Sequence, residues 1–296
     1  MVNYQTWMGE LGDDTKISKL SIPGTHNSAA CRTALPSVQC QGESVTEQLK
    51  HGVRFLDIRV GRMLVGGKKD QELQVIHGKF PVKIPFPLKL LDALDEVYKF
   101  LQENPSETVI VSLKQEGSDD WDNDQDEFAK AIWNNYIDPQ KDRWYLNPGI
   151  PTLGDARGKA ILFRRFGVKD ENLKNQFGFD ASYWTYNTIK DERDEFVVQD
   201  FCEVNSGDDI PRKIEYINEF SKTAEDYISN NDNKLFLNFT SASNFFDRKC
   251  WPKAISEAML EANIDQEFRR GAGIIVLDYV EAQDWRMSKK LVDTNF

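Results

Sequence analysis

The sequence predicts an α/β fold, a single-domain (β/α)8 barrel of the TIM type. The 296 residues, 40% of them hydrophobic, suffice for one buried core of ordinary barrel size. Short apolar runs recur along the chain, separated by helical patterns or long loops, as in parallel sheets. The runs number eight, as in a closed barrel, and cover residues 17–22, 53–60, 73–76, 109–113, 160–164, 195–199, 235–239 and 273–277. No repeat, linker or low-complexity segment divides the chain, so residues 1–296 are predicted to form one domain.

Amphipathic patterns between these runs predict the helices that cover the sheet. Residues 88–101 place apolar side chains on one face, and the pattern stops at Asn104-Pro105 because proline cannot continue a helix. Residues 210–228 and 251–262 predict two more helices. The acidic stretch 119–127 predicts the start of a fourth, where carboxylates suit the helix dipole. A calcium loop is the weaker reading of that stretch, because it lacks the glycine and final glutamate of an EF-hand.

Charge and hydropathy exclude several classes of protein. The net charge is −11 and the sequence pI is about 4.9, so no nucleic acid partner is expected. No apolar run is long enough to span a membrane, and the N-terminus lacks the layout of a signal peptide.

Two smaller patterns have structural explanations. Four cysteines, which allow three disulfide pairings, are spaced unlike metal ligands: Cys31, Cys40, Cys202 and Cys250. A local bridge between Cys31 and Cys40 is feasible and stays open. Asn238 begins a glycosylation sequon, but it lies in a predicted strand, so burial is expected.

The most informative pattern is that nearly every run ends in a strongly polar side chain. These residues are His26, Asp57, Arg59, His77, Lys114, Arg165, Asp200 and Asp278. Each alone is explained by a surface charge, a loop cap or a core histidine. Together they predict one convergent site, because the carboxyl ends of barrel strands meet at one mouth. His51 precedes a run, at the wrong end, and is given no role.

The chemistry of this set matches a phosphodiester. Two histidines supply a general base and a general acid. Arg59, Lys114 and Arg165 supply positive charge for phosphate oxygens or hydroxyls. No metal is expected, because Arg59 lies two residues from Asp57 on the same strand face and would repel a cation there.

The motifs around these residues closely resemble those of the bacterial phosphatidylinositol-specific phospholipases C. Residues 20–26 (LSIPGTH) are similar to the first catalytic segment of that family, and residues 51–59 (HGVRFLDIR) to the second. The likeness continues in family order at 75–78, 104–108, 112–114, 153–159, 198–200, 238–241 and 277–279, and spans roughly residues 7–285.

The resemblance implies an irregular barrel that cleaves phosphatidylinositol to diacylglycerol and inositol 1,2-cyclic phosphate, with GPI anchors as further candidate substrates. It implies that His26 takes the proton of the inositol 2-hydroxyl and that Asp278 orients its ring. His77, with Asp57 as partner, would protonate the departing diacylglycerol oxygen. Arg59 would stand where calcium lies in eukaryotic relatives, so no cofactor and no calcium dependence are expected.

The resemblance also names substrate contacts and two departures. The residues expected to bind substrate are Asn27, Lys114, Arg165, Asp200 and Trp184. Asn27 replaces an aspartate, so it can hydrogen-bond the guanidinium of Arg59 but cannot balance its charge. Cys202 replaces a tyrosine that packs beneath the inositol ring, and Tyr183, Trp184 or Tyr186 is expected to take its place.

The expected partner is a membrane surface that contains phosphatidylinositol, contacted peripherally by a monomer. Phe245 and Phe246, near the mouth, either insert into that surface or belong to the core. A secreted protein is expected, its signal peptide not present in this chain, and a cytoplasmic one stays open.

Two alternatives are weighed. A metal-dependent glycerophosphodiester phosphodiesterase is disfavoured by Arg59. A catalytically weak inositol-lipid binding module is suggested by Asn27 and Cys202 but disfavoured by the two histidines and Asp278.

Overall fold

The structure is a computed structural model that describes residues 2–31, 34–63, 72–117, 120–229 and 233–296. Its strands in these ranges are β1 (Ser21–Thr25), β2 (Phe55–Arg62), β3 (Leu73–His77), β4 (Phe80–Pro81), β5 (Val109–Gln115), β6 (Trp144–Tyr145), β7 (Ala160–Arg165), β8 (Phe179–Asp180), β9 (Asp191–Glu192), β10 (Phe196–Gln199), β11 (Leu235–Phe239) and β12 (Gly273–Leu277). Its helices are α1 (Val45–Lys50), α2 (Leu90–Glu103), α3 (Glu127–Ile132), α4 (Leu153–Ala156), α5 (Glu171–Lys174), α6 (Ile210–Ser229), α7 (Pro252–Glu261) and α8 (Ala282–Asp293).

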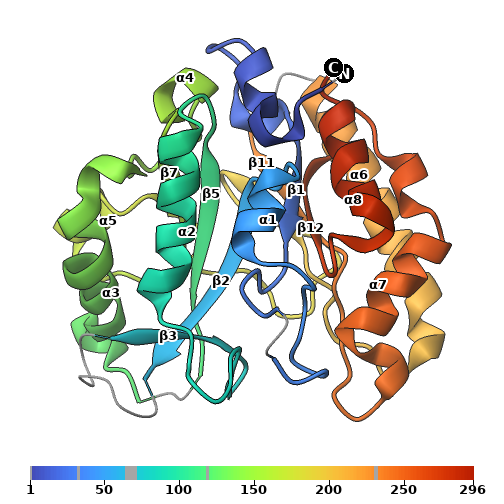
Figure 1. The fold of residues 1–296 in the computed structure, drawn as a ribbon, viewed down its shortest axis with the longest axis horizontal. Helices are drawn as coiled ribbons and strands as arrows, with labels where there is room; N and C mark the ends of the chain where they lie inside the picture. Colours follow the sequence, from blue (N-terminus) through green and yellow to red (C-terminus); the bar gives the residue numbers. More distant parts are fainter. Residues whose placement is uncertain (1, 32–33, 64–71, 118–119, 230–232) are drawn as a thin grey trace.

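One curled sheet carries the fold. Its strand order is β6-β7-β5-β2-β1-β12-β11-β10-β9, and from β7 to β10 every neighbouring pair is parallel. The first and last strands lie side by side, with Ser21 opposite Gly273 and Thr25 opposite Leu277. Figure 1 shows α2, α3 and α5 on one flank and α6, α7 and α8 on the other, with both chain termini at the same end.

The predicted TIM-type barrel is confirmed in an irregular form. In the described ranges β8 pairs with β7 and β9 with β10, and no recorded strand pairing joins these two edges. Aromatic packing spans the interior there instead: the Phe163 and Phe179 rings lie 5.2 Å apart, and the Phe179 and Phe196 rings 6.1 Å apart. The hydrogen-bonded sheet is therefore a half-barrel, and apolar side chains fill its interior.

Two of the eight predicted strands differ from the prediction. The third, β3, runs antiparallel to β2 rather than parallel, because the connection between them is too short for a crossover helix. The first is shifted: Ile17–Lys19 form a 3-10 turn and the strand is Ser21–Thr25, directly before His26. The other six predicted strands are present.

The helix predictions hold with one adjustment. α2, α6 and α7 are confirmed close to their predicted ranges. The acidic stretch precedes α3, which begins at Glu127 after a 3-10 turn at Asn123–Gln125, while Asp119 lies outside the described residues. α1 and α8 were not expected from the pattern. The described residues contain no helix long and apolar enough to cross a membrane.

The structure also answers the questions of the cysteines and the sequon. All four cysteines lie in described ranges and none forms a disulfide, so the Cys31–Cys40 bridge is not seen. Asn238 is confirmed as a buried strand residue, and its side-chain amide donates to the Ile217 carbonyl and the Ser221 hydroxyl.

Alternation along the strands separates two apolar cores. In β2, Phe55 belongs to the core inside the sheet, whereas Leu56 and Ile58 pack against the helices. Asp57 and Arg59 share the inward face of Phe55, since side chains two residues apart point the same way. The strand therefore carries an apolar layer deep in the barrel and a charged layer above it.

A buried ion pair fixes the N-terminal segment beneath the sheet. The Arg54 guanidinium donates to Glu107 Oε2 over 2.7 Å, and neither side chain is exposed. Arg54 also donates to the carbonyls of Leu49 and Val53, while Glu107 accepts from the backbone N–H of Met8. Every polar group of this pair has a partner that another part of the chain supplies.

Glu107→Ala is expected to lower the free energy of unfolding by about 3–5 kcal/mol, because it leaves the Arg54 guanidinium buried without its counter-charge. The measurement is urea denaturation: the midpoint of unfolding should fall, while the dependence of the free energy of unfolding on urea concentration should not change. Lys50→Ala is the matched control, since its ion pair with Glu47 is exposed, and its midpoint should stay at that of the parent chain. An equal midpoint for Glu107→Ala would contradict the argument.

Candidate active site

A cavity of about 620 Å³ opens at the carboxyl ends of the parallel strands. The predicted site residues that line it are His26, Arg59, His77, Lys114, Arg165, Trp184 and Asp200. Asp57 and Asp278 are buried directly behind this lining. The structure therefore brings the strand-end residues together at one mouth, as the sequence predicts.

Three cations stand side by side because their strands are in register. Arg59 on β2 lies beside Lys114 on β5 in the strand register, and Lys114 lies beside Arg165 on β7. All three face the cavity. Burial and the charge of Arg59 lower the pKa of Lys114, as expected for cations held close together. This row can stabilise an anion that enters the mouth.

His26 is held by the last strand. Its Nδ1 lies 2.8 Å from Asp278 Oδ1, and the carboxylate side chain is almost fully buried. With Asp278 ionised, Nδ1 carries the proton and Nε2 is the free base. Burial and then Arg59 lower the pKa of His26 well below the ordinary histidine value. A neutral ring oriented in this way is suited to accept a proton.

His77 has a different partner from the predicted one. Its Nδ1 donates to the Val38 carbonyl over 2.8 Å, and the described contacts of Asp57 do not include His77. The predicted Asp57 partnership is therefore not seen, because two arginines already occupy that carboxylate. The bond to Val38 fixes the Nδ1–H tautomer, so Nε2 is the atom left for proton transfer.

Asp57 is the centre of the charged layer. Its Oδ2 accepts from Arg59 Nε at 3.1 Å, and its Oδ1 accepts from Arg165 at 3.1 Å. The Asn27 backbone N–H donates to Oδ2 as well. Burial alone would raise the pKa of Asp57, but Arg59 and Arg165 outweigh it and hold the pKa well below its usual range. The Asp57 carboxylate therefore stays charged and orients the guanidiniums of Arg59 and Arg165.

Glu116 is a site residue that the sequence reasoning missed. One carboxylate oxygen lies 3.3 Å from Arg59 and 3.2 Å from Lys114, and the other accepts from the Gly78 N–H. Burial would raise the pKa of Glu116, but Arg59 and Lys114 lower it to about 2. Its position two residues after Lys114, directly after the end of β5, was the available signal.

Asn27 does not contact the cavity. Its side chain is fully buried, and neither the nitrogen nor the oxygen of the side-chain amide has a hydrogen-bond partner. Its backbone is left-handed, with a φ of 42°. The expected substrate contact and the bond to Arg59 are therefore not seen. Arg59 nevertheless has two carboxylate partners, Asp57 and Glu116, so its charge is balanced without an aspartate at position 27.

Trp184 forms one wall of the cavity. Its indole N–H donates to Asp200 Oδ2 over 3.1 Å, and the Arg165 guanidinium lies 3.9 Å from its ring centre. Tyr183, Tyr186 and Cys202 line the same wall. Aromatic surface is therefore available where the thiol of Cys202 provides none.

The two histidines differ in acidity. Their rings stand edge to face with centroids 5.6 Å apart. Burial and Arg59 lower the pKa of both rings, well below the ordinary value for His26, whereas the Val38 carbonyl and Glu116 counteract the shift for His77. This difference in surroundings favours His26 as the base and His77 as the acid.

These properties define a class of enzyme. Two oriented histidines beside a row of fixed cations can move protons at both ends of an anionic ester. The fold and the site together indicate an α/β-barrel phosphodiesterase.

The comparisons with known proteins specify the family. The family described as phosphatidylinositol-specific phospholipase C, X domain, matches residues 14–166. A curated relative named 1-phosphatidylinositol phosphodiesterase, from Listeria monocytogenes, is 31% identical over 95% of this chain and 83% of its own length. A protein of the same name from Staphylococcus aureus is 30% identical over 81% of this chain and 75% of its own. This chain belongs to the phosphatidylinositol-specific phospholipase C family.

Solved structures agree on the fold. The phosphatidylinositol-specific phospholipase C of Listeria monocytogenes matches with a TM-score of 0.74 and 27% identity over the whole of both chains. A variant of the Staphylococcus aureus enzyme matches with a TM-score of 0.80 and 21% identity, over 99% of this chain and 98% of that one.

Glu116→Gln is expected to move the basic limb of the kcat/KM profile to lower pH. The charge of Glu116 raises the pKa of His77, so removing it lets that pKa fall, and the acid loses its proton at a lower pH. The acidic limb, where His26 becomes protonated, is the internal reference.

The measurement is the pH profile with a water-soluble substrate. Glu261→Gln is the control, because it makes the same substitution at an exposed position on α7, and it should leave both limbs in place. A basic limb that rises in pH in Glu116→Gln would be inconsistent with His77 as the acid.

Proposed function

We propose that this protein cleaves phosphatidylinositol to diacylglycerol and inositol 1,2-cyclic phosphate. The observation that carries the proposal is the pair His26 and His77, which face one cavity with centroids 5.6 Å apart beside three cations. The family relatives carry the name 1-phosphatidylinositol phosphodiesterase, which supports a lipid substrate.

The chemistry is an internal substitution at phosphorus. His26 Nε2 takes the proton of the inositol 2-hydroxyl, whose oxygen forms the new bond to phosphorus. The bond to the diacylglycerol oxygen breaks, and His77 gives that oxygen its proton. Asp278 keeps His26 in the right tautomer and balances the charge that the ring gains.

Arg59 is proposed to stabilise the charge on phosphorus without a metal. Its guanidinium is fixed by Asp57 and Glu116, so it needs no rearrangement as the negative charge develops. Lys114, Arg165 and Asp200 are proposed to hold inositol hydroxyls, with Trp184 as the apolar wall of the sugar site. GPI anchors are proposed as further substrates on the family resemblance.

Release of cyclic phosphate from phosphatidylinositol vesicles, followed by phosphorus NMR, tests this function directly. The product should form undiminished in excess chelator, and His26→Ala and Arg59→Ala should each lower kcat by at least about 100-fold. Calcium should restore part of the activity of Arg59→Asp.

Other results would point to the alternatives. Activity that appears only with added metal would indicate a metal-dependent phosphodiesterase. Binding of phosphatidylinositol without turnover would indicate a lipid-binding module.

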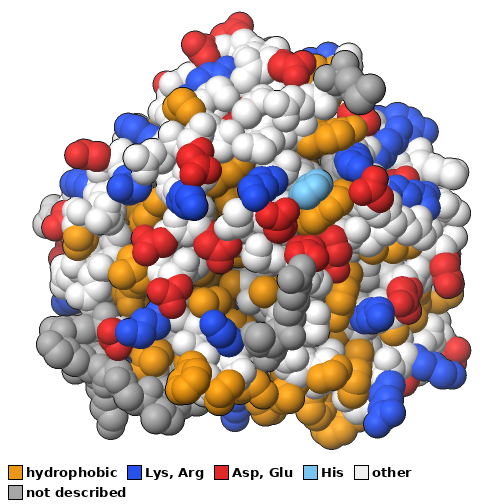
Figure 2. Space-filling model, in the orientation of Figure 1, with side chains coloured by type: hydrophobic (Ala, Val, Ile, Leu, Met, Phe, Trp, Pro, Cys, Tyr) orange, Lys and Arg blue, Asp and Glu red, His pale blue; other side chains and the backbone are white. Residues whose placement is uncertain are grey.

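Apolar side chains at the mouth are proposed to contact the membrane. Phe246 is 95% exposed and Phe245 54%, and both line the cavity, which removes core burial as their explanation. The Phe245 ring stacks on Phe80 at 6.3 Å, and Phe86 is 78% exposed. Figure 2 shows apolar side chains gathered along the lower margin of the molecule, the end at which β3 lies in Figure 1. We define Phe80, Phe86, Phe245 and Phe246 as the aromatic rim.

Phe246→Ala is expected to weaken vesicle binding by about 10- to 100-fold, since burying one phenylalanine contributes about 1.5–3 kcal/mol. Its turnover of a water-soluble substrate should match that of the parent chain. Phe296→Ala is the matched control, because this exposed ring lies at the opposite end, where Figure 1 places the C-terminus. The measurement is vesicle co-sedimentation. An equal loss of vesicle binding in both variants would contradict membrane contact by the aromatic rim.

We also propose, from the family resemblance, that the protein is secreted and monomeric.

A further inference from the structure

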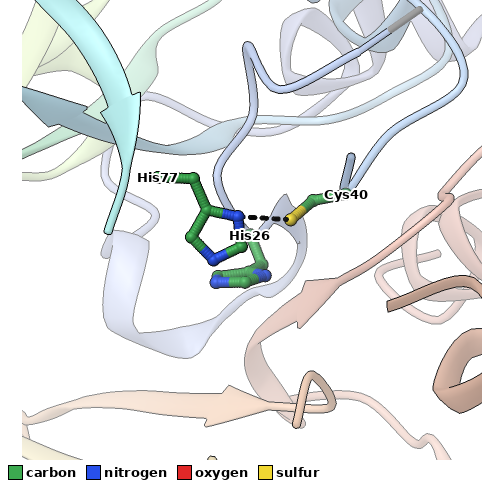
Figure 3. Close-up of side chains that lie close together, drawn as sticks. All are labelled: His26, Cys40 and His77. Atoms are coloured by element: carbon green, nitrogen blue, oxygen red, sulfur yellow. Dashed lines mark hydrogen bonds between the residues drawn. The ribbon is translucent and has the colours of Figure 1, made fainter. Parts of the chain in front are cut away.

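Three potential metal ligands meet at the edge of the cavity: His26 and His77 line it, and Cys40 is buried beside them. One ligand atom from each of His26, Cys40 and His77 lies within 4.8 Å of the others. Figure 3 shows the three side chains arriving from different segments: His26 after β1, His77 at the end of β3, and Cys40 from the loop between β1 and α1. The proposed cleavage uses both histidines but assigns nothing to the thiol.

The spacing of one ligand pair fits a single tetrahedral ion, and the third ligand atom lies within 4.8 Å of both. Cys40 Sγ lies 3.7 Å from His77 Nδ1. Zinc binds sulfur at about 2.3 Å and imidazole nitrogen at about 2.0–2.1 Å, so the two ligand atoms of one tetrahedral zinc lie about 3.6 Å apart. This pair therefore already has the separation that a shared ion requires. Two imidazoles and a thiolate are the donor set of zinc rather than of calcium or magnesium.

The third ligand, His26, is oriented by a carboxylate, as is typical of histidines in metal sites. His26 Nδ1 is engaged by Asp278 at 2.8 Å, which leaves Nε2 as the atom able to bind an ion. A carboxylate that accepts from the far nitrogen of a ligating histidine orients the ring and makes it a better donor.

The charges around the cluster permit a cation. Arg59, Lys114 and Arg165 would oppose it, but four carboxylates belong to the same site: Asp57, Glu116, Asp200 and Asp278. Arg59 is paired with two of them. Binding would release the thiol proton to solvent, and the Nδ1 proton of His77, now donated to Val38, would shift to Nε2.

We infer that His26, Cys40 and His77 form an inhibitory site for a divalent ion of the zinc class. The bound ion takes the nitrogen that the base needs and fixes the His77 ring, so binding and catalysis exclude each other. Cys40 is the one member that catalysis does not need, and it gives the site its preference for soft ions. The inhibitory role, but not the binding, rests on the proposed function.

The test compares the parent chain with Cys40→Ala and with Cys250→Ala, a control that removes another buried thiol. Co²⁺ added to metal-free protein should produce a thiolate-to-cobalt charge-transfer band in the parent and in Cys250→Ala, and none in Cys40→Ala. Zn²⁺ should inhibit phosphatidylinositol cleavage in the first two at concentrations at least about tenfold below those needed for Cys40→Ala. Chelator should restore activity.

The contrary results are distinct. A parent chain that cleaves phosphatidylinositol but shows no cobalt band, or equal zinc sensitivity in all three proteins, overturns the site. A cobalt band without any cleavage overturns the proposed function and the inhibitory role, and leaves the metal site standing. If Cys40→Ala does not fold, Cys40→Ser replaces it, since serine keeps the size and the donor but is a poor zinc ligand.

Discussion

The carboxylate of Asp57 is the constraint on which the site depends. It is fully buried, and it is tolerated because three donors from three segments converge on it: the turn after β1, Arg59 on β2 and Arg165 on β7. One buried anion thus determines where two guanidiniums stand. Without it, Arg59 and Arg165 would lie buried beside Lys114 without their shared counter-charge, so the same hydrogen bonds stabilise the mouth and fix its cations in place.

Much of this arrangement could be predicted from the sequence because its causes are local. Apolar runs identify strands, and a polar residue at the end of a run lies at the mouth whichever helix follows. The strand register places Arg59, Lys114 and Arg165 in one row, because Arg59 on β2 lies beside Lys114 on β5, which in turn lies beside Arg165 on β7. The likeness to the family motifs added the roles of these residues, and the comparisons confirm the family.

The remainder depends on tertiary contacts that no local pattern encodes. The apolar run of β3 looks like any other, and only its pairing shows that it turns back on β2. His77 is held by a carbonyl, Val38, and carbonyls carry no sequence signal. Asn27 looked like a substrate ligand because it follows a catalytic histidine, yet its left-handed backbone turns it inward. The open edge between β8 and β9 reflects aromatic packing rather than any missing run.

The pairing of the first strand with the last has a consequence for biosynthesis. The dyad of His26 and Asp278 joins residues 252 positions apart, so the His26 ring is not oriented until β12 has docked beside β1. A chain still emerging from the ribosome, or one cut short before β12, holds every cation of the mouth and yet lacks the carboxylate that positions His26. The row of cations and the oriented imidazole are therefore completed at different stages of synthesis, and the imidazole comes second.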